Sequence, residues 1–491
     1  MSVFDEIIKE RKQKAEAIKR AGFSVYPLTV KKTHTVAKAL QDFSKIQKSG
    51  KEVFLVGRVR TIRGHGKITF LHFNDGSGLM QALLKQDILG EKSYRFFLEN
   101  FDIGDIAEFR GVLLKTKKGE KTIEVRNFRM LTKNFLPLPE KWHGLKDIED
   151  RYRKRYLDLI FNPEVKNKFE IRAKIIQEIR SFLEREEFLE VETPILQPIY
   201  GGAKAKPFKT HLNALDMDLY LRIAPELYLK RLLIGGIEKV YEIGRVFRNE
   251  GIDRSHNPDF TTLEFYWAYA DYKDLMALTE KMLVETVKKI LGKTTIEYNG
   301  KKINFKAPFE RIEFSQLIKR HTKIDIDGIH LEKLKEEAKK MGIVASPGAK
   351  KAEIADEIYK EFCLSKIQNP LFVIHHPIGA FALAKQLESN PKKLANFQLV
   401  IAGWELINAF SELNDPIEQR KRFEEQEKSF KLGFEEAQRI DEDFLEALGY
   451  GMPPAAGFGM GIDRLAVLLT DSHNLREVIL FPTMKSQQSK A

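Results

Sequence analysis

The chain has 491 residues, of which 43% are hydrophobic and 31% are charged. This composition excludes a disordered, tail-like protein, and the length favours two to four domains with more than one buried core. Lys and Arg exceed Asp and Glu by 12, and residues 1–150 alone hold 29 basic against 19 acidic side chains. Because nearly all of the excess lies in the first third of the chain, we expect that third to contact a polyanion.

Cysteine content and hydropathy narrow the class of protein. The single Cys363 excludes a disulfide framework and a multi-cysteine zinc site, and it fits a reducing compartment. No run of about 18 apolar residues is present, so we expect no membrane span. The N-terminus alternates charged and apolar residues and lacks the apolar core of a secretory signal. We therefore expect a cytoplasmic enzyme or binding protein.

The N-terminal third is predicted to be a small barrel behind a helical extension. Residues 1–50 form the extension, and its first 25 residues are typical of a solvated helix. Between residues 51 and 135, five short runs mix apolar and polar residues and are separated by Gly and Asp. Five strands in a basic segment favour an oligonucleotide-binding (OB) barrel, with a purely structural or dimerisation barrel as the alternative.

A Pro-rich linker is expected at 136–150, followed by a larger α+β domain at 151–491. The domain opens with a helix at 166–184 and a strand at 188–194, whose final Pro194 indicates a sheet edge or an interface. Further elements are strands at 239–247 and 261–269, a charge-rich helical insertion at about 308–366 with no readable chemistry, a strand at 400–410, and a Gly-rich loop entering an apolar helix at 455–469.

The segment from Arg248 to Tyr266 carries the clearest chemical pattern. A strand ends at Arg248, whose planar guanidinium suits a phosphate or carboxylate, and a polar loop follows. Alternation on the returning strand places four side chains on one face: Phe260, Thr262, Glu264 and Tyr266. The alternative interpretation is a hairpin with ordinary surface charge.

Three segments in order resemble the signature motifs of the class II aminoacyl-tRNA synthetases. Residues 188–194 resemble motif 1, residues 248–266 motif 2, and the Gly-rich 457–465 motif 3. With the preceding barrel, the resemblance covers nearly the whole chain and is closest to the lysyl family of bacterial type. It implies an α+β protein in which an OB-fold barrel precedes a catalytic domain built on an antiparallel sheet flanked by helices.

The resemblance implies an ATP site. Arg248 and Arg464 would be catalytic, because they neutralise phosphate charge while the amino-acid carboxylate attacks. The implied ATP-binding residues are Arg248, Glu250, His256, Asn257, Phe260, Glu405 and Arg464. Mg²⁺ is expected with the triphosphate, and Glu405 matches a metal ligand. The second expected carboxylate falls on Gln398, which leaves the number of metal sites open.

The amino-acid substrate is predicted from the charge of the pocket, because aspartate and asparagine enzymes share this architecture. A lysine ammonium needs carboxylates, whereas an aspartate side chain needs a cation. Glu264 and Glu412 lie in apolar strands, where an unpaired carboxylate would cost several kcal/mol. The implied lysine-binding residues are Gly202, Glu226, Glu264, Tyr266, Asn408, Phe410 and Glu412. The alternative is that Glu264 and Glu412 are surface carboxylates.

The barrel would read the anticodon of lysine tRNA. The resemblance implies that Phe70 stacks on a base, that Gln81 reads its edge and that Glu120 makes another contact. The alternative for Phe70 is a place in the barrel core.

The implied activity is ATP-dependent activation of L-lysine to lysyl-adenylate and transfer to the 3′ end of lysine tRNA. The partners would be lysine tRNA, ATP, L-lysine and a second copy of the chain, bound through the region around Pro194. Phe381, Ala382 and Trp404 depart from the family pattern. The rival hypotheses are a paralogue that attaches lysine or a related amino acid to a protein and a catalytically dead RNA-binding or regulatory protein.

Overall fold

The structure is a computed structural model that describes residues 3–139, 147–346, 348–431 and 439–486. The chain forms two compact units, one ending at Lys146 and the other beginning at Asp147. Part of the linker expected at 136–150, residues 140–146, lies outside the described residues, and residues 148–150 already belong to a helix.

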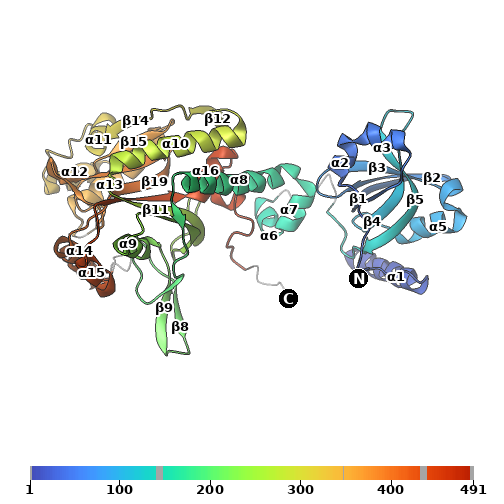
Figure 1. Cartoon of the computed structure of the whole chain (residues 1–491), viewed down its shortest axis with the longest axis horizontal. Coiled ribbons are helices and arrows are strands. Elements are labelled where there is room, and N and C mark those ends of the chain that lie inside the picture. Colours follow the sequence, from blue (N-terminus) through green and yellow to red (C-terminus); the bar gives the residue numbers. More distant parts are fainter. Residues whose placement is uncertain (1–2, 140–146, 347, 432–438, 487–491) are drawn as a thin grey trace. The chain divides into compact units, whose positions relative to one another are not determined.

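The first unit contains a closed five-stranded barrel, as predicted (Figure 1). The strands follow one another around the barrel in the order β1-β2-β3-β5-β4. Along β2, Leu71 and Phe73 point into the core while Phe70 and His72 point outward. The strands are β1 Val53–His65, β2 Ile68–Asn74, β3 Leu79–Lys85, β4 Ile106–Lys115 and β5 Lys121–Thr132.

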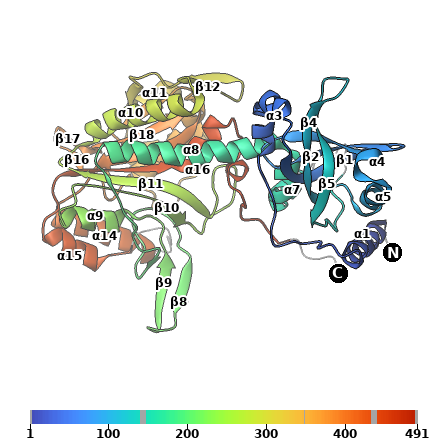
Figure 2. The same ribbon diagram turned by 45° about the vertical axis from the view of Figure 1, so that its right-hand side comes forward.

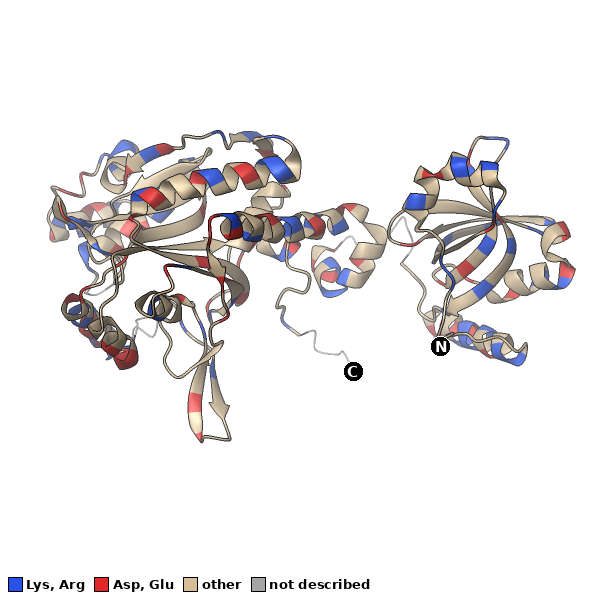
Figure 3. Ribbon diagram, in the orientation of Figure 1, with Lys and Arg blue, Asp and Glu red and all other residues tan. Residues whose placement is uncertain are grey.

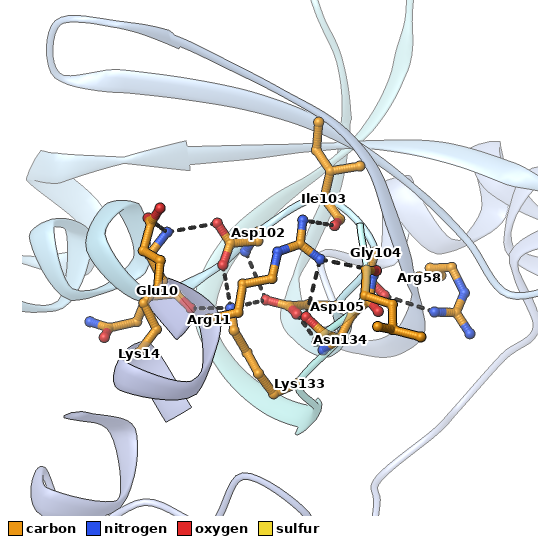
Figure 4. A network of polar contacts seen from close by, with 12 residues as sticks. Glu10, Arg11, Lys14, Arg58, Asp102, Ile103, Gly104, Asp105, Lys133 and Asn134 are labelled. Carbon is orange, nitrogen blue, oxygen red and sulfur yellow. Dashed lines mark hydrogen bonds and ion pairs between the residues drawn. The ribbon is translucent and has the colours of Figure 1, made fainter. Parts of the chain in front are cut away.

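The helices of the first unit share the barrel's hydrophobic core. Ala15 and Ile18 on α1 join the same cluster of buried residues as the inward-facing strand residues. A group of charges also fixes α1 to the barrel, since Lys14 Nζ lies 2.8 Å from Asp102 Oδ1 (Figure 4). The helices are α1 Val3–Arg20, α2 Val36–Gln41, α3 Phe43–Ser49, α4 Gln86–Leu89 and α5 Glu91–Asn100.

The second unit is built on an eight-stranded sheet, which confirms the predicted fold class. The strand order is β14-β15-β18-β19-β20-β11-β10-β6, antiparallel throughout except for the outermost pair at each edge. The strands are β6 Leu189–Glu190, β10 Lys239–Phe247, β11 Asp259–Ala268, β14 Glu310–Glu313, β15 Leu371–Ile374, β18 Asn396–Ile401, β19 Trp404–Ser411 and β20 Ala455–Gly461.

Helices cover both faces of this sheet (Figure 2). Three of them, α8 Pro163–Arg185, α10 Tyr272–Leu291 and α16 Ile462–Leu469, share one core with Leu263 and Phe265 of β11. On the other face, α9 Glu226–Ile234 packs against β10 and β11. Because successive strand residues alternate between faces, β11 presents its even-numbered residues to the α9 side.

The remaining elements surround this framework. The expected insertion consists of β14 followed by α11 Phe314–Thr322, α12 Leu331–Lys340, α13 Lys351–Phe362 and a short 3₁₀ helix at Leu364–Lys366. The other elements are α6 Ile148–Arg153, α7 Arg155–Phe161, β7 Leu196–Gln197, β8 Lys209–Leu212, β9 Met217–Leu221, β12 Thr295–Tyr298, β13 Lys301–Asn304, β16 Gln386–Leu387, β17 Asn390–Leu394, α14 Pro416–Lys431, α15 Glu442–Gly449 and a 3₁₀ helix at Leu475–Glu477. Within the described residues, no helix is long and apolar enough to cross a membrane.

Three predicted elements differ in detail. The single strand expected at 400–410 is a hairpin, because Ala402 and Gly403 both adopt positive φ and reverse the chain. The Gly-rich 455–461 is a central strand rather than a loop. Glycine is usually depleted in strands, so the residue preferences of this segment disfavour a strand. Pairing with the neighbouring strands imposes the strand conformation. The strand expected at 188–194 is only two residues long, although it lies at the sheet edge as predicted.

Candidate active site

A cavity of about 780 Å³ lies in the second unit against β11, β19 and β20. The four residues predicted to share a face of β11 all line it, whereas Leu263 and Phe265 pack under the helices on the opposite face. Alternation along one strand therefore supplies an aromatic ring, a hydroxyl, a carboxylate and a phenol to a single cavity.

Two arginines lie at one end of the cavity. Arg248, just beyond the end of β10, has its guanidinium 5.2 Å from the centre of the Phe260 ring. Arg464, on α16, donates through Nη1 to the backbone oxygen of Glu405. Burial lowers the pKa of Arg248, while Glu250 and Glu264 oppose that shift. The arrangement presents two cationic side chains to an anionic ligand.

The loop between β10 and β11 is organised by Asp253. The carboxylate accepts backbone N–H bonds from Ser255 at 2.6 Å and from His256 at 2.8 Å. Burial acts against ionisation, but these bonds and the His256 ring hold the pKa of Asp253 at about 2. Asn257 donates to the backbone oxygen of Asp259 at 2.7 Å. Glu250, His256 and Asn257 all line the cavity.

Carboxylates gather at the other end of the cavity. Glu264 on β11 accepts a 3.2 Å hydrogen bond from the hydroxyl of Tyr266, and burial raises the pKa of Glu264 to about 8. Glu226, the first residue of α9, also lines the cavity. Asn408 and Phe410 complete this end from β19.

Glu412 differs from these residues because its side chain does not line the cavity but lies behind Gly457, which does. It is 1% exposed, and its Oε1 lies only 1.9 Å from where a Cβ on Gly457 would stand. Among the described residues, that oxygen accepts no hydrogen bond. Gly457 itself lines the cavity, so the absence of a side chain there brings Glu412 close to the ligand space.

Gly202 also has a structural reason to be glycine. Its φ is +88°, and a Cβ there would lie 2.9 Å from the Cβ atoms of Ala224 and Glu226. Backbone at Gly202 therefore approaches the cavity beside Glu226, at a position where other residues would be strained.

Lys230 is the principal residue that sequence reasoning missed. Its ammonium is fully buried, lies 2.6 Å from Glu226 Oε1 and also pairs with Glu412. The sequence held a signal, since Glu226 and Lys230 are four residues apart in one helix, the spacing of an ion pair along a helix face.

The expected metal corner holds Glu405 and Gln398, which both line the cavity. Asn396 Oδ1 accepts from the backbone of His376, so its Nδ2 donates to His376 Nδ1. The imidazole proton is then on Nε2, 3.2 Å from Gln398 Oε1. Burial lowers the pKa of His376 to about 4, which keeps the ring neutral. Gln398 thus offers one remaining lone pair and no charge.

The insertion contributes to the cavity, which nothing in its sequence indicated. Asp356 and Lys360 on α13 line the cavity and pair with each other at 2.7 Å. Only tertiary packing brings this helix to the site.

Two of the three positions that depart from the family pattern, Phe381 and Trp404, make aromatic contacts. Phe381 lines the cavity and stacks on Phe410 with ring centres 6.2 Å apart. Trp404 donates to the hydroxyl of Tyr298 at 2.9 Å, and the Arg254 guanidinium lies 5.3 Å from the Trp404 ring.

The three residues predicted to bind the anticodon are Phe70 on β2, Gln81 on β3, which is buried, and Glu120 in the turn before β5. Gln81 donates to Glu120 Oε2 at 2.7 Å, and the other carboxylate oxygen of Glu120 contacts His72 at 2.9 Å. Phe70 is half-buried and lies outside the barrel core. Figure 3 shows Lys and Arg distributed over α1 and the barrel strands.

Comparison with known proteins agrees with this geometry. The sequence model of the family of class II tRNA synthetases (D, K and N) matches residues 147–485. The family model of the OB-fold nucleic acid binding domain matches residues 53–131. The lysine–tRNA ligase of Carboxydothermus hydrogenoformans is 48% identical over 482 residues, which cover 98% of each chain. Those of Moorella thermoacetica and Halalkalibacterium halodurans are 47% and 45% identical, with 98% or more of each chain covered.

The barrel and the eight-stranded sheet with its two-ended cavity define a class II aminoacyl-tRNA synthetase with an anticodon-binding OB domain. Identity of 45–48% to lysine–tRNA ligases over 98% or more of each chain narrows the assignment within this class. It belongs to the family of the lysine–tRNA ligases.

Proposed function

We propose that the chain activates L-lysine with ATP and transfers it to lysine tRNA. The observation that carries this proposal is that one cavity is lined by Arg248 and Arg464 and also by Glu226, Glu264 and Tyr266. Arg464 lies beside Gly461 and Tyr266 beside Gly457, towards opposite ends of β20, so the two sets of side chains occupy different ends. Lysine has a carboxylate at one end and two ammonium groups, so it matches this division of charge. A site for aspartate would need a cation where Glu264 lies.

In the first step, the lysine carboxylate attacks the α-phosphorus of ATP, and pyrophosphate leaves with the electrons of the broken P–O bond. Arg248 would hold the carboxylate and the α-phosphate together, and Arg464 would neutralise charge on the leaving phosphates. Phe260 and Glu250 would hold adenine by stacking and by accepting from its amino group. In the second step, the terminal ribose 3′-hydroxyl attacks the lysyl carbonyl, and AMP leaves.

At the other end, the ε-ammonium of lysine would bind Glu264, Tyr266 and Glu412, whose Oε1 lacks a donor among the described residues. Glu226 would bind the α-ammonium beside the backbone of Gly202. Asn408 and Phe410 would line the aliphatic chain.

The donor set fits a Mg²⁺ ion that arrives with the triphosphate. The described residues contain no group of three or more His, Cys, Asp or Glu placed to hold a metal. Glu405 would supply the charged ligand and Gln398 a neutral oxygen. When bound, Mg²⁺ neutralises phosphate charge and orients the triphosphate.

The outer face of the barrel would bind the anticodon. Phe70 would stack on a base, and Gln81 and Glu120, held by their mutual hydrogen bond, would read base edges. The basic side chains of this unit would contact the RNA backbone in a salt-dependent manner.

We propose a homodimer formed through the region around Pro194. Leu189, Ile195 and Leu196 flank it and are each about half exposed, as expected of an apolar surface covered by a second copy. A cytoplasmic location fits the one cysteine, which is free and buried. Sedimentation of the purified protein tests the dimer, and a monomer at micromolar concentration would contradict it.

Aminoacylation of total tRNA with each of the twenty amino acids tests substrate and reaction together. We expect charging with lysine alone, and lysine-dependent exchange between ATP and pyrophosphate without tRNA. Charging with aspartate or asparagine would refute the lysine assignment. Adenylate formation without tRNA charging would favour the protein-modifying paralogue, and absence of both activities would favour the catalytically dead protein.

A further inference from the structure

Lys230 is a buried cation between two of the carboxylates assigned to the substrate. Its side chain has no exposed surface and does not line the cavity. The ammonium lies 2.6 Å from Glu226 Oε1, pairs with Glu412 and lies 5.7 Å and 6.0 Å from the ring centres of Phe410 and Tyr266. Lys230 therefore contacts two of the carboxylates that would bind lysine, Glu226 and Glu412, and it does so from the side that faces away from the cavity.

The charges at this end of the cavity balance only if Lys230 is counted. Glu226, Glu264 and Glu412 provide three negative charges, and Lys230 provides one positive charge, which leaves a net charge of two negatives for the two ammonium groups of lysine. Without Lys230, one of three buried carboxylates would have no counter-ion even with substrate bound, and such a group takes up a proton instead.

Other charged groups near Lys230 are already paired. On β10, Glu242 pairs with Arg222, and next to Lys230 on α9, Arg231 pairs with Asp441. Glu264 has no basic partner in the described ion pairs, and among the described side chains only the Tyr266 hydroxyl donates a hydrogen bond to it, at 3.2 Å. Lys230 is thus the cation that pairs with Glu226 and Glu412, while the Glu264 carboxylate has no cationic partner until the ligand binds.

We infer that Lys230 is a positioning residue for lysine recognition: it fixes Glu226 and Glu412 beside the cavity and keeps both ionised before the substrate arrives. This inference rests on the proposed function, since it concerns the same site. Burial raises the pKa of both carboxyls, and Lys230 opposes that rise. The two carboxylates in turn raise the pKa of Lys230, so the ammonium stays charged.

The number of protons released when lysine binds tests this role directly. Calorimetry at pH 7.5 in buffers of different ionisation enthalpy counts them. In the wild-type protein Glu226 and Glu412 are both paired with Lys230, which leaves Glu264 as the carboxyl that must lose a proton, so we expect release of about one. In Lys230→Met, two further carboxyls would be protonated before binding, and we expect release of about two protons with binding at least ~10-fold weaker.

Three variants separate charge from packing. Lys230→Gln keeps a donor but removes the charge and should behave like Lys230→Met, whereas Lys230→Arg should restore release of about one proton. Lys133→Met is the matched control, because Lys133 is equally buried between Asp102 and Asp105 in the other unit. It should leave lysine affinity and proton count unchanged.

The outcomes separate the proposed function from the Lys230 inference. Wild-type protein that does not bind lysine refutes the proposed function. Wild-type protein that binds lysine with release of two or more protons refutes the Lys230 inference without any variant. An unchanged proton count in Lys230→Met or Lys230→Gln also refutes the inference. So does an equal rise in the KM for ATP and the KM for lysine in these two variants.

Discussion

The hydroxyl of Tyr266 donates a 3.2 Å hydrogen bond to Oε2 of Glu264, and both residues face the cavity from the same strand. This is the only hydrogen bond that the Glu264 carboxylate receives from the described side chains. A buried carboxylate with one neutral donor is poorly stabilised, which is why burial raises the pKa of Glu264 to about 8.

Lysine binding should therefore tighten as pH rises. Below pH 8 the Glu264 carboxyl is protonated and must lose its proton to pair with an ammonium, so the Kd should fall up to ~10-fold per pH unit between pH 6.5 and 8. Above pH 8 the Kd should level off. Titration calorimetry measures it, and Glu264→Gln should bind weakly with a flat profile. A flat wild-type profile would mean that Glu264 does not contact the substrate.

Gly457→Ala should damage the lysine end of the cavity. Its Cβ would lie 1.9 Å from Glu412 Oε1 and 2.5 Å from Tyr266 Cε1, so both groups must move. Overpacking costs about 1–3 kcal/mol, which corresponds to a KM for lysine raised about 5- to 150-fold. Gly459→Ala is the matched control, because its Cβ would meet nothing closer than 3.8 Å. Equal effects of the two substitutions on lysine-dependent exchange would contradict this geometry.

Arg248→Met should lower kcat for adenylate formation by ~10²–10³-fold, because an interaction with charge that develops in the transition state is lost. Arg245, three residues earlier on β10, is exposed and pairs with Asp259 at 3.2 Å. Arg245→Ala should leave exchange within about twofold of wild type. Pre-steady-state exchange kinetics distinguish the two, and normal turnover in Arg248→Met would remove it from the catalytic residues.

Phe70→Ala should weaken tRNA binding without affecting adenylate formation. Loss of base stacking costs about 1–3 kcal/mol, so the KM for tRNA should rise about 5- to 150-fold. Phe54 is a second half-buried phenylalanine on the outside of the barrel, and its ring lies 5.6 Å from Lys31 Nζ. Phe54→Ala should charge tRNA normally. If both variants lose charging equally, the effect comes from the fold of the barrel.

Lys133→Met should destabilise the first unit. The Lys133 ammonium is buried between Asp102 at 2.6 Å and Asp105 at 2.8 Å (Figure 4). Removing one partner of a buried ion pair costs about 3–5 kcal/mol. Lys14→Met removes a more exposed partner of the same Asp102 and should cost less than about 1 kcal/mol. Denaturant unfolding of the full chain measures both, and equal losses would contradict the assignment of Lys133 as the buried anchor.

Local patterns in the sequence determined several parts of the fold and site. Period-2 alternation placed Phe260, Thr262, Glu264 and Tyr266 on one face, whereas Pro194 lies beyond the two-residue edge strand Leu189–Glu190. The alternation succeeds because strand geometry acts over a few residues.

Only the tertiary structure decided the rest. Pairing with the neighbouring strands made a central strand of the Gly-rich 455–461, against the weak strand preference of glycine. As a result, Gly457 lets Glu412 approach the cavity. The tertiary structure also brought Asp356 from the insertion to the cavity, and it placed Lys230 between Glu226 and Glu412, which are 186 residues apart. Which charges meet in a buried site depends on distances across the whole fold, and no local spacing encodes them.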